Sequence, residues 1–263
     1  MTGLFKTILA AGVLMVGTFA STQPVQADDF DKIKSKGSMK IAMSGAYPPF
    51  NFVNEKNEVV GFDPSIGKEI AKRIGVEAKI VTTAWDGILA GLLANKYDAI
   101  VGSMSITPKR LKVVDFVGPY YSSGRAIFVS EASTFKTMAD LKGKKIGVTL
   151  GETHEKWARS QDGMNWELKT YKGLPELLLE LEHNRIDGFV IDSIPGRVAI
   201  TKDKRPIREM DLSELKQSSV GVGIAIRKGN PKLAASMQSA LDAMMKDGTH
   251  KAIGMKWIGA DIR

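Results

Sequence analysis

The sequence contains no cysteine, so the protein can form no disulfide bond and offers no cysteine for attachment of a lipid anchor. Its stability must therefore come from burial of apolar side chains, which a hydrophobic fraction of 43% permits. The three histidines, His154, His183 and His250, do not have the spacing of metal ligands. Because a P-loop and a dinucleotide-binding glycine motif are also absent, we expect no cofactor and no metal.

The sequence also lacks an apolar run long enough to cross a bilayer. The run from Ile8 to Ala20 has roughly a dozen residues, whereas a membrane-spanning helix needs about 20. It follows Lys6 and precedes the small-residue pattern Val25-Gln26-Ala27, which is typical of a cleavable signal peptide. We expect residues 1–27 to be that signal peptide, with an uncleaved anchor as the alternative. The mature protein should then be free in the periplasm and not a lipoprotein.

A net charge of +8 raises the question of nucleic-acid binding. The cations are scattered in pairs among acids, as at Lys144-Lys145 and Lys204-Arg205. Since the chain is also expected to be exported, we interpret these cations as a solvated surface and expect no nucleic-acid partner.

From Met39 onward, short apolar runs alternate with amphipathic stretches, which is typical of a parallel sheet covered by helices. Asp63 and Pro64 are expected to be the N-cap and first position of one helix, which Gly75 ends. We expect strands at 39–43, 78–82, 98–102, 126–130, 145–149, 168–171 and 188–191, and further helices at 85–95, from about 152, 174–183, 231–246 and 248–257.

One internal similarity indicates two related halves. Residues 95–101 (NKYDAIV) match residues 184–190 (NRIDGFV), although chance similarity between helix-turn-strand units is the alternative. The glycine-bearing segments 120–125 and 218–223 have the composition of hinges. We therefore predict an α/β fold of two lobes, each a mainly parallel sheet flanked by helices, joined by two hinge strands. Lobe 1 would comprise 28–122 and 221–263, and the inserted lobe 2 would comprise 123–220.

Candidate site residues follow the strands, because ligands of open α/β sheets bind beyond the carboxyl ends of the strands. Residues Gly102 to Arg110 (GSMSITPKR) combine hydroxyls, a helix start and a guanidinium, which together can bind a carboxylate. A second helix start at Gly151-Glu152-Thr153 can share that carboxylate. Asp192, which ends an apolar strand, can accept hydrogen bonds from an ammonium group or cap the next helix. An anion site opposite an acid suits the backbone ends of an amino acid.

Two aromatic residues, Tyr47 and Trp85, occur where the wall of a pocket would lie. Packing in the core is the alternative role for both.

These segments resemble the extracellular solute-binding proteins, family 3, of ABC transporters for polar amino acids, from about Met39 to Gly259. The resemblance implies a two-lobed periplasmic binding protein of type II that closes on a free amino acid and presents it to an ABC permease in the inner membrane. We expect a monomer. The motifs that carry the resemblance are Tyr47-Pro48-Pro49-Phe50, Gly61-Phe62-Asp63, Trp85-Asp86-Gly87, Ser103 to Arg110, Asp115-Phe116, Pro119-Tyr120, Leu141 to Val148, Arg185 to Gly188 and Asp247-Gly248-Thr249.

The resemblance also implies roles for individual residues. Arg110 would bind the α-carboxylate together with the amides of Ser105 and Thr153. Asp192 would bind the α-ammonium, helped by Ser103 and the backbone near Gly102. Tyr47 and Trp85 would lie on either side of the ligand side chain.

The sequence departs from the family at Ser44 and Glu152. Members that bind lysine, arginine, ornithine or histidine carry an acid where Ser44 stands, and a serine is familiar where Glu152 stands. Glu152 can supply that acid for a cationic side chain, or cap its helix. Phe52 and His154 are further candidates for specificity. Residues 151–157 are more similar to the cystine-binding branch, so the ligand stays open among polar amino acids, including basic ones and cystine.

An enzyme is the main alternative, since periplasmic cyclohexadienyl and arogenate dehydratases are similar to this fold. Glu152 and His154 would then be the general acid and base. A receptor module is another alternative, but it would be expected to continue into a membrane helix. We expect a binding protein without catalytic residues, because Arg110 and Asp192 account for the site without chemistry.

Overall fold

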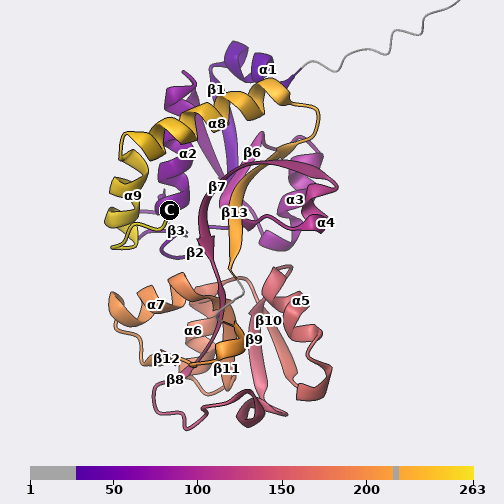
Figure 1. The fold of residues 1–263 in the computed structure, drawn as a ribbon, viewed down its shortest axis with the longest axis vertical. Helices are drawn as coiled ribbons and strands as arrows, with labels where there is room; N and C mark the ends of the chain where they lie inside the picture. Colours follow the sequence, from indigo (N-terminus) through magenta and orange to yellow (C-terminus); the bar gives the residue numbers. More distant parts are fainter. Residues whose placement is uncertain (1–27, 216–218) are drawn as a thin grey trace, which may run out of the picture.

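The computed structural model describes residues 28–215 and 219–263. The predicted signal peptide therefore lies outside the described residues. The described chain forms two bodies, one above the other, each built around its own five-stranded sheet (Figure 1). We call the body around the first sheet lobe 1 and the body around the second sheet lobe 2.

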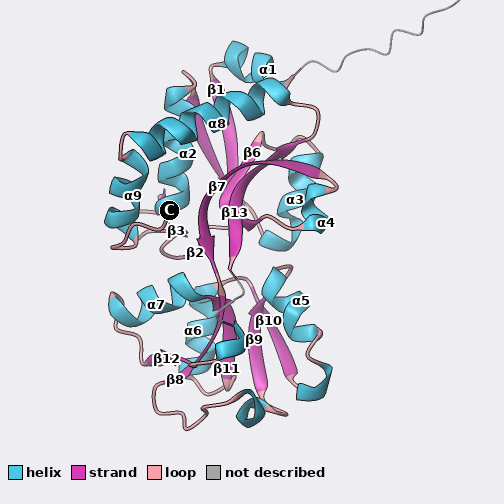
Figure 2. Cartoon of the chain, in the orientation of Figure 1, coloured by secondary structure: helices cyan, strands magenta, loops and turns pink. Residues whose placement is uncertain are grey.

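Lobe 1 has a sheet with the strand order β5-β1-β6-β13-β7, with helices on both sides of it (Figure 2). A smaller sheet, β2-β3-β4, lies at its lower end. The elements of lobe 1 are α1 (Asp29–Lys36), β1 (Ser38–Met43), β2 (Ala46–Tyr47), β3 (Asn51–Val53), β4 (Val59–Val60), α2 (Phe62–Arg73), β5 (Glu77–Thr82), α3 (Trp85–Leu93), β6 (Ala99–Ser105), α4 (Pro108–Leu111), β7 (Val114–Ser123), β13 (Val220–Arg227), α8 (Pro231–Lys246) and α9 (Thr249–Trp257).

Lobe 2 has a sheet with the order β10-β9-β11-β8-β12. Its elements are β8 (Arg125–Ser130), η1 (Met138–Leu141), β9 (Lys145–Thr149), α5 (Thr153–Arg159), η2 (Asp162–Met164), β10 (Glu167–Tyr171), α6 (Leu174–Glu182), β11 (Gly188–Asp192), α7 (Ser193–Thr201), β12 (Ile207–Glu209) and η3 (Ser213–Leu215).

The two sheets share one pattern of strand directions. The first three strands of each order are parallel, and the fourth, β13 or β8, is antiparallel to both of its neighbours. Each fourth strand enters directly from the other lobe, so it starts at the edge where the parallel strands end. The two lobes therefore have the related architecture that the internal similarity predicts.

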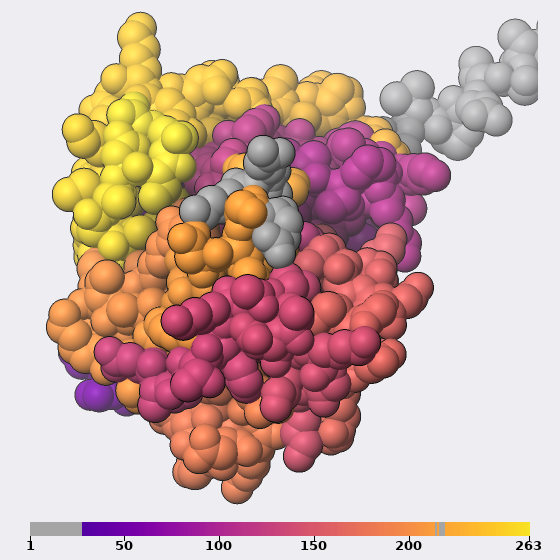
Figure 3. All heavy atoms as spheres, turned by 60° about the horizontal axis from the view of Figure 1, so that its bottom comes forward, coloured from indigo at the N-terminus to yellow at the C-terminus, as the bar shows by residue number. Residues whose placement is uncertain are grey.

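The two crossing segments lie side by side. Strand β7 leads through Gly124 into β8, and the first residue of β13, Val220, pairs with Ser123. The domain boundaries predicted after residues 122 and 220 fall at the ends of these crossing strands and stay a prediction. The lobes also meet beside the crossing, where the Lys202 ammonium donates to the Trp257 carbonyl at 3.0 Å. In Figure 3, yellow C-terminal residues of lobe 1 lie directly against orange residues of lobe 2.

Helix α2 has the buried face that its apolar spacing predicts, with Ile66, Ile70 and Ala71 each 0% exposed. The prediction that Asp63 is its N-cap is wrong, because α2 begins at Phe62 with Gly61 in the N-cap position. Asp63 lies inside the first turn and is itself 0% exposed. The physical reason is that its carboxylate accepts hydrogen bonds from groups in the core, described below, and not from the helix end.

Strand β6 is longer than its apolar pattern predicts. It continues through Gly102 to Ser105, because Met104 and Ser105 pair with Gly223 and Val222 of the returning strand β13. Such a pairing between distant segments leaves no local signal in the sequence. Within residues 28–215 and 219–263, no helix combines the length and the apolarity that crossing a bilayer requires.

Candidate functional site

The carboxyl ends of the parallel strands of both lobes point toward one another. Tyr47 follows β1 in lobe 1, and its hydroxyl donates to Oδ2 of Asp192, the last residue of β11 in lobe 2. The Tyr47 ring stacks on Phe50 at a centroid distance of 5.7 Å, which holds the ring in place. The space between the lobes at these strand ends is therefore the candidate site.

Asp192 lies at the N-cap position of α7, but its side chain makes no capping hydrogen bond there. Its Oδ2 faces both the Tyr47 hydroxyl and Nε2 of His154, the latter at 3.4 Å. No described residue forms a hydrogen bond or ion pair with Oδ1. Burial would raise the pKa of Asp192, but His154, Tyr47 and Arg125 hold it below its ordinary value. The carboxylate is therefore ionised, with one oxygen left for another donor.

Arg110 lies in the short helix α4, after Thr107, whose hydroxyl accepts from the Arg110 amide at 3.2 Å. Its guanidinium donates to the Ser105 carbonyl at 3.0 Å and lies 5.7 Å from the centre of the Trp85 ring. Burial lowers the pKa of Arg110, and the charges of Glu152 and Asp192 oppose that shift. Within the described part of the chain, no acid forms an ion pair with this half-buried cation.

Glu152 precedes α5 and approaches the Thr153 amide at only 3.4 Å, so it is a weak cap. Burial raises the pKa of Glu152, while the charges of Arg110 and His154 lower it. None of the described cations comes within ion-pair distance of Glu152. This acid and Arg110 therefore lie near each other in the cleft without a direct bond.

Ser103 and Gly102 lie within β6, behind the cleft. The Ser103 hydroxyl donates to Asp63 at 2.8 Å, so it has only lone pairs to offer an ammonium group. Ser103 has a φ of 60°, which lies in the left-handed region. A Cβ on Gly102 would lie 3.2 Å from Cα of Met43 in β1, so a side chain would crowd the neighbouring strand.

The structure separates the two other candidates for specificity. The Ser44 hydroxyl donates to Oδ1 of Asn51 at 2.9 Å, and Asn51 in turn donates to Asp63 at 2.6 Å. Phe52 packs edge-on against Trp257 of α9 at a centroid distance of 6.0 Å. Ser44 therefore belongs to a polar network beside the cleft, whereas Phe52 belongs to the packing around α9.

Two pockets extend from Trp85 between the lobes. One, of about 1160 Å³, has Trp85, Arg110, Glu152 and Thr153 in its wall. The other, of about 460 Å³, has Ser44 and Trp85 in its wall, together with residues of lobe 2. Trp85 is 7% exposed and lies between these spaces, as expected of a wall residue. The larger pocket therefore brings Trp85, Arg110, Glu152 and Thr153 together, whereas Tyr47 and Asp192, which contact each other, are in neither wall. The roles of the predicted site residues stay predictions.

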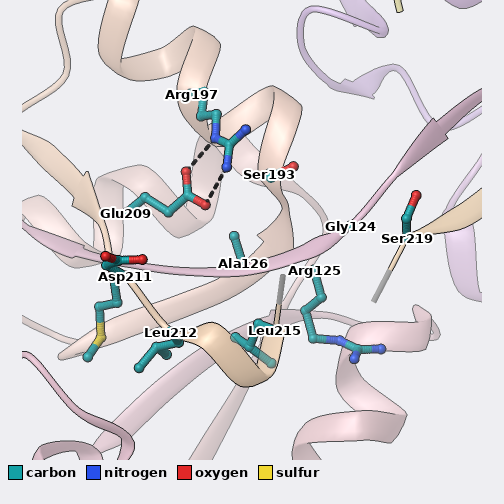
Figure 4. A pocket seen from close by; sticks show the side chains of 11 residues that line it. Gly124, Arg125, Ala126, Ser193, Arg197, Glu209, Asp211, Leu212, Leu215 and Ser219 are labelled. Atoms are coloured by element: carbon teal, nitrogen blue, oxygen red, sulfur yellow. Dashed lines mark hydrogen bonds and ion pairs between the residues drawn. The ribbon is translucent and has the colours of Figure 1, made fainter. Parts of the chain in front are cut away.

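Arg125 and Asp63 lie at or beside the site but are not among the residues predicted for it. Arg125 in β8 is opposite Asp192 in the register of the antiparallel strands β8 and β11. The Arg125 guanidinium lies 4.7 Å from the centre of the Trp157 ring. It also borders a pocket of about 470 Å³ on lobe 2, where it points away from the ion pair of Arg197 and Glu209 (Figure 4). Its place in a glycine-bearing hinge segment was the available signal. Asp63 had no such signal, because only long-range contacts bury it.

The fold and the site define a two-lobed binding protein, with a cation on one lobe and an acid on the other. The chain belongs to the bacterial extracellular solute-binding proteins, family 3, whose family model matches residues 39–260. This match confirms the resemblance that the motifs indicate.

Sequence alignments with known proteins extend over nearly the whole chain. It is 34% identical to the L-cystine-binding protein TcyJ of Escherichia coli (strain K12), over 99% of this chain and 95% of that protein. It is 33% identical to the L-arginine-binding protein of Pseudomonas aeruginosa, over 97% of this chain and 95% of that protein. The crystal structure of the ancestral amino acid-binding protein AncCDT-1, a precursor of cyclohexadienyl dehydratase, matches with a TM-score of 0.80 and 33% identity over 87% of this chain and 99% of that one. These matches confirm the predicted fold class.

Proposed function

We propose that the protein binds a free polar amino acid between its lobes and passes it to an ABC permease in the inner membrane, as a monomer in the periplasm. The observation that carries the proposal is the pair Arg110 and Asp192. Each is a charged group on one lobe with bonding capacity that no described residue uses, and the charge of Asp192 raises the pKa of Arg110 against the effect of burial. The membership in a solute-binding family supports the same function.

Arg110 is assigned to the α-carboxylate. A half-buried guanidinium without an ion pair is costly, and an anionic ligand with two oxygens can accept two parallel hydrogen bonds from it. The stacking of Arg110 on Trp85 orients the guanidinium before the ligand arrives.

Asp192 is assigned to the α-ammonium. Tyr47 and His154 both approach Oδ2, so the ligand would take Oδ1. The help from Ser103 that the resemblance implies stays a prediction, because its hydroxyl lies behind the cleft and donates to Asp63. Tyr47 and Trp85 would then border the ligand side chain from lobe 1.

Glu152 is assigned to a second cationic group on the ligand. The named relatives bind cystine or arginine, and each of these amino acids carries a cationic group besides its α-ammonium. Glu152 is an acid in the wall of the larger pocket and lacks an ion pair with any described residue. We therefore propose a ligand of this kind.

The experiment is calorimetric titration of the mature protein with cystine, arginine, ornithine, histidine and glutamate, for wild type and Arg110→Ala. We expect binding of one of the first three and at least a hundredfold loss in the variant, because the α-carboxylate loses a charged partner. Arg185→Ala is the matched control, since that exposed arginine pairs with Glu180 away from the cleft. Undiminished affinity in Arg110→Ala would refute the assignment.

A dehydratase is the second candidate, favoured by two observations. The pKa of Glu152 is raised, as suits a general acid, and His154 lies close to it. In addition, the matching ancestral binding protein is a precursor of cyclohexadienyl dehydratase. Turnover of prephenate or arogenate by the purified protein would support this candidate in place of binding alone.

A further inference from the structure

The backbone conformation at Gly173 does not require a glycine. It precedes α6 with a φ of 176°, which is extended backbone that any residue adopts. It is nevertheless buried, and a Cβ built on it would lie 2.2 Å from the carbonyl oxygen and 2.9 Å from Cβ of Ala46. The three atoms nearest to that Cβ all belong to Ala46, which is in the other lobe. The space for a side chain is therefore taken by lobe 1 and by the closed arrangement of the lobes.

A second glycine of lobe 2 makes a comparable approach. A Cβ on Gly151 would lie 2.9 Å from Cα of Asp86. Gly151, however, has a φ of 80°, so its own backbone already favours glycine. Of these two glycines, Gly173 is the one at which contact between the lobes alone excludes a side chain.

The contact at Gly173 is next to the site. Ala46 is in β2, directly before Tyr47, whose hydroxyl reaches Asp192 in lobe 2. A side chain at residue 173 would push β2 and the start of α6 apart by more than an ångström, since carbon atoms in contact are about 3.5 Å apart or more. Such a displacement would lengthen the hydrogen bond from the Tyr47 hydroxyl to Asp192, because Tyr47 directly follows Ala46.

We propose that Gly173 sets the limit of lobe closure: its missing side chain lets the start of α6 rest on Ala46, and this contact brings Tyr47 to Asp192. The proposal rests on the proposed function, because closure matters only if it serves ligand capture. A single methyl group at this position favours the open form without touching the ligand. A ligand shifts the equilibrium toward the closed form only as far as its affinity for the closed form exceeds its affinity for the open form.

The test uses Gly173→Ala, with Gly163→Ala as the matched control, because a Cβ on Gly163 of lobe 2 has no atom within 4 Å. The absence of native cysteines allows spin labels on cysteines introduced in place of the exposed residues Lys246 in lobe 1 and Lys136 in lobe 2. Interlobe distance distributions are measured without and with the amino acid that binds wild type. Calorimetry and thermal unfolding are measured on the same variants without labels.

We expect Gly173→Ala to lose the short-distance population and to bind at least tenfold more weakly, with an unfolding temperature within a few degrees of wild type. Gly163→Ala should retain both the population and the affinity. An equal closed population in wild type and Gly173→Ala would overturn the role of Gly173. A closed population in wild type together with no binding of any amino acid would instead count against the proposed function alone. If wild type showed no closed population in any condition, both proposals would fail.

Discussion

The Tyr47 hydroxyl of lobe 1 donates a hydrogen bond to the Asp192 carboxylate of lobe 2. The two residues are on different lobes, so the bond exists only while the lobes are closed. A hydrogen bond to a charged group contributes about 1.5–3 kcal/mol. The closed form thus contains a stabilising contact that needs no ligand, and the same contact leaves Oδ1 of Asp192 available.

The first prediction concerns this bond. Tyr47→Phe keeps the ring that packs on Phe50 and removes the hydroxyl, so it should weaken ligand binding about tenfold, equivalent to about 1.4 kcal/mol. Stability of the ligand-free protein should change little, because the open lobes do not use the bond. Calorimetric titration and thermal unfolding measure the two quantities.

Tyr97→Phe is the control for Tyr47→Phe. The Tyr97 hydroxyl donates to the Ile88 carbonyl inside lobe 1, so its loss should lower stability and leave affinity unchanged. Unchanged affinity in Tyr47→Phe would show that the interlobe bond does not assist capture.

The second prediction concerns Glu152. Glu152→Gln removes the charge of a half-buried acid without changing its shape, and we expect affinity for the cationic ligand to fall at least tenfold. Stability without ligand should rise slightly, since the acid is half-buried and lacks an ion pair with any described residue. Calorimetry with the ligand that binds wild type checks the first effect.

Glu167→Gln in the same lobe is the matched control, because the exposed Glu167 pairs with Lys169 and lies in neither pocket wall. If Glu152→Gln bound the cationic ligand as tightly as wild type, the acid would have no part in specificity.

The third prediction concerns Asp63. Its carboxylate accepts from Asn51, Ser103 and Tyr120, at 2.6, 2.8 and 2.7 Å. Burial raises its pKa to about 6 from 3.8, against the opposing effect of these hydrogen bonds. The folded state therefore binds more protons than the unfolded state between these values, and stability falls as pH rises through this window.

Asp63→Asn removes this titration, so the wild type should lose about 2 kcal/mol relative to the variant between pH 4 and pH 7. Urea unfolding of both proteins at several pH values measures the difference. A difference in unfolding free energy that does not vary with pH would contradict a raised pKa at Asp63.

Much of the fold could be predicted because its signals are local. The strand 145–149 was predicted with its exact ends, and α8 likewise, because apolar spacing, Pro231 and the following Asp247-Gly248 mark them within a few residues. The candidates Arg110 and Asp192 could be found because they follow strands, where ligands of α/β sheets bind.

Other features depend on residues far apart in the chain. The pattern Asp63-Pro64 favours a helix cap locally, yet three donors from β3, β6 and β7 determine what the Asp63 carboxylate does. Likewise, β6 is extended by a strand that returns after the whole of lobe 2.

The sequence by itself determined the strand and helix pattern, the family motifs and the charged residues at the strand ends, because these depend on neighbours within one or two turns of the chain. Only the tertiary structure decided that Tyr47 meets Asp192 and that Gly173 meets Ala46. These pairs come together because the two lobes close on each other. Their residues are far apart in the chain, so no local spacing in the sequence predicts the contact.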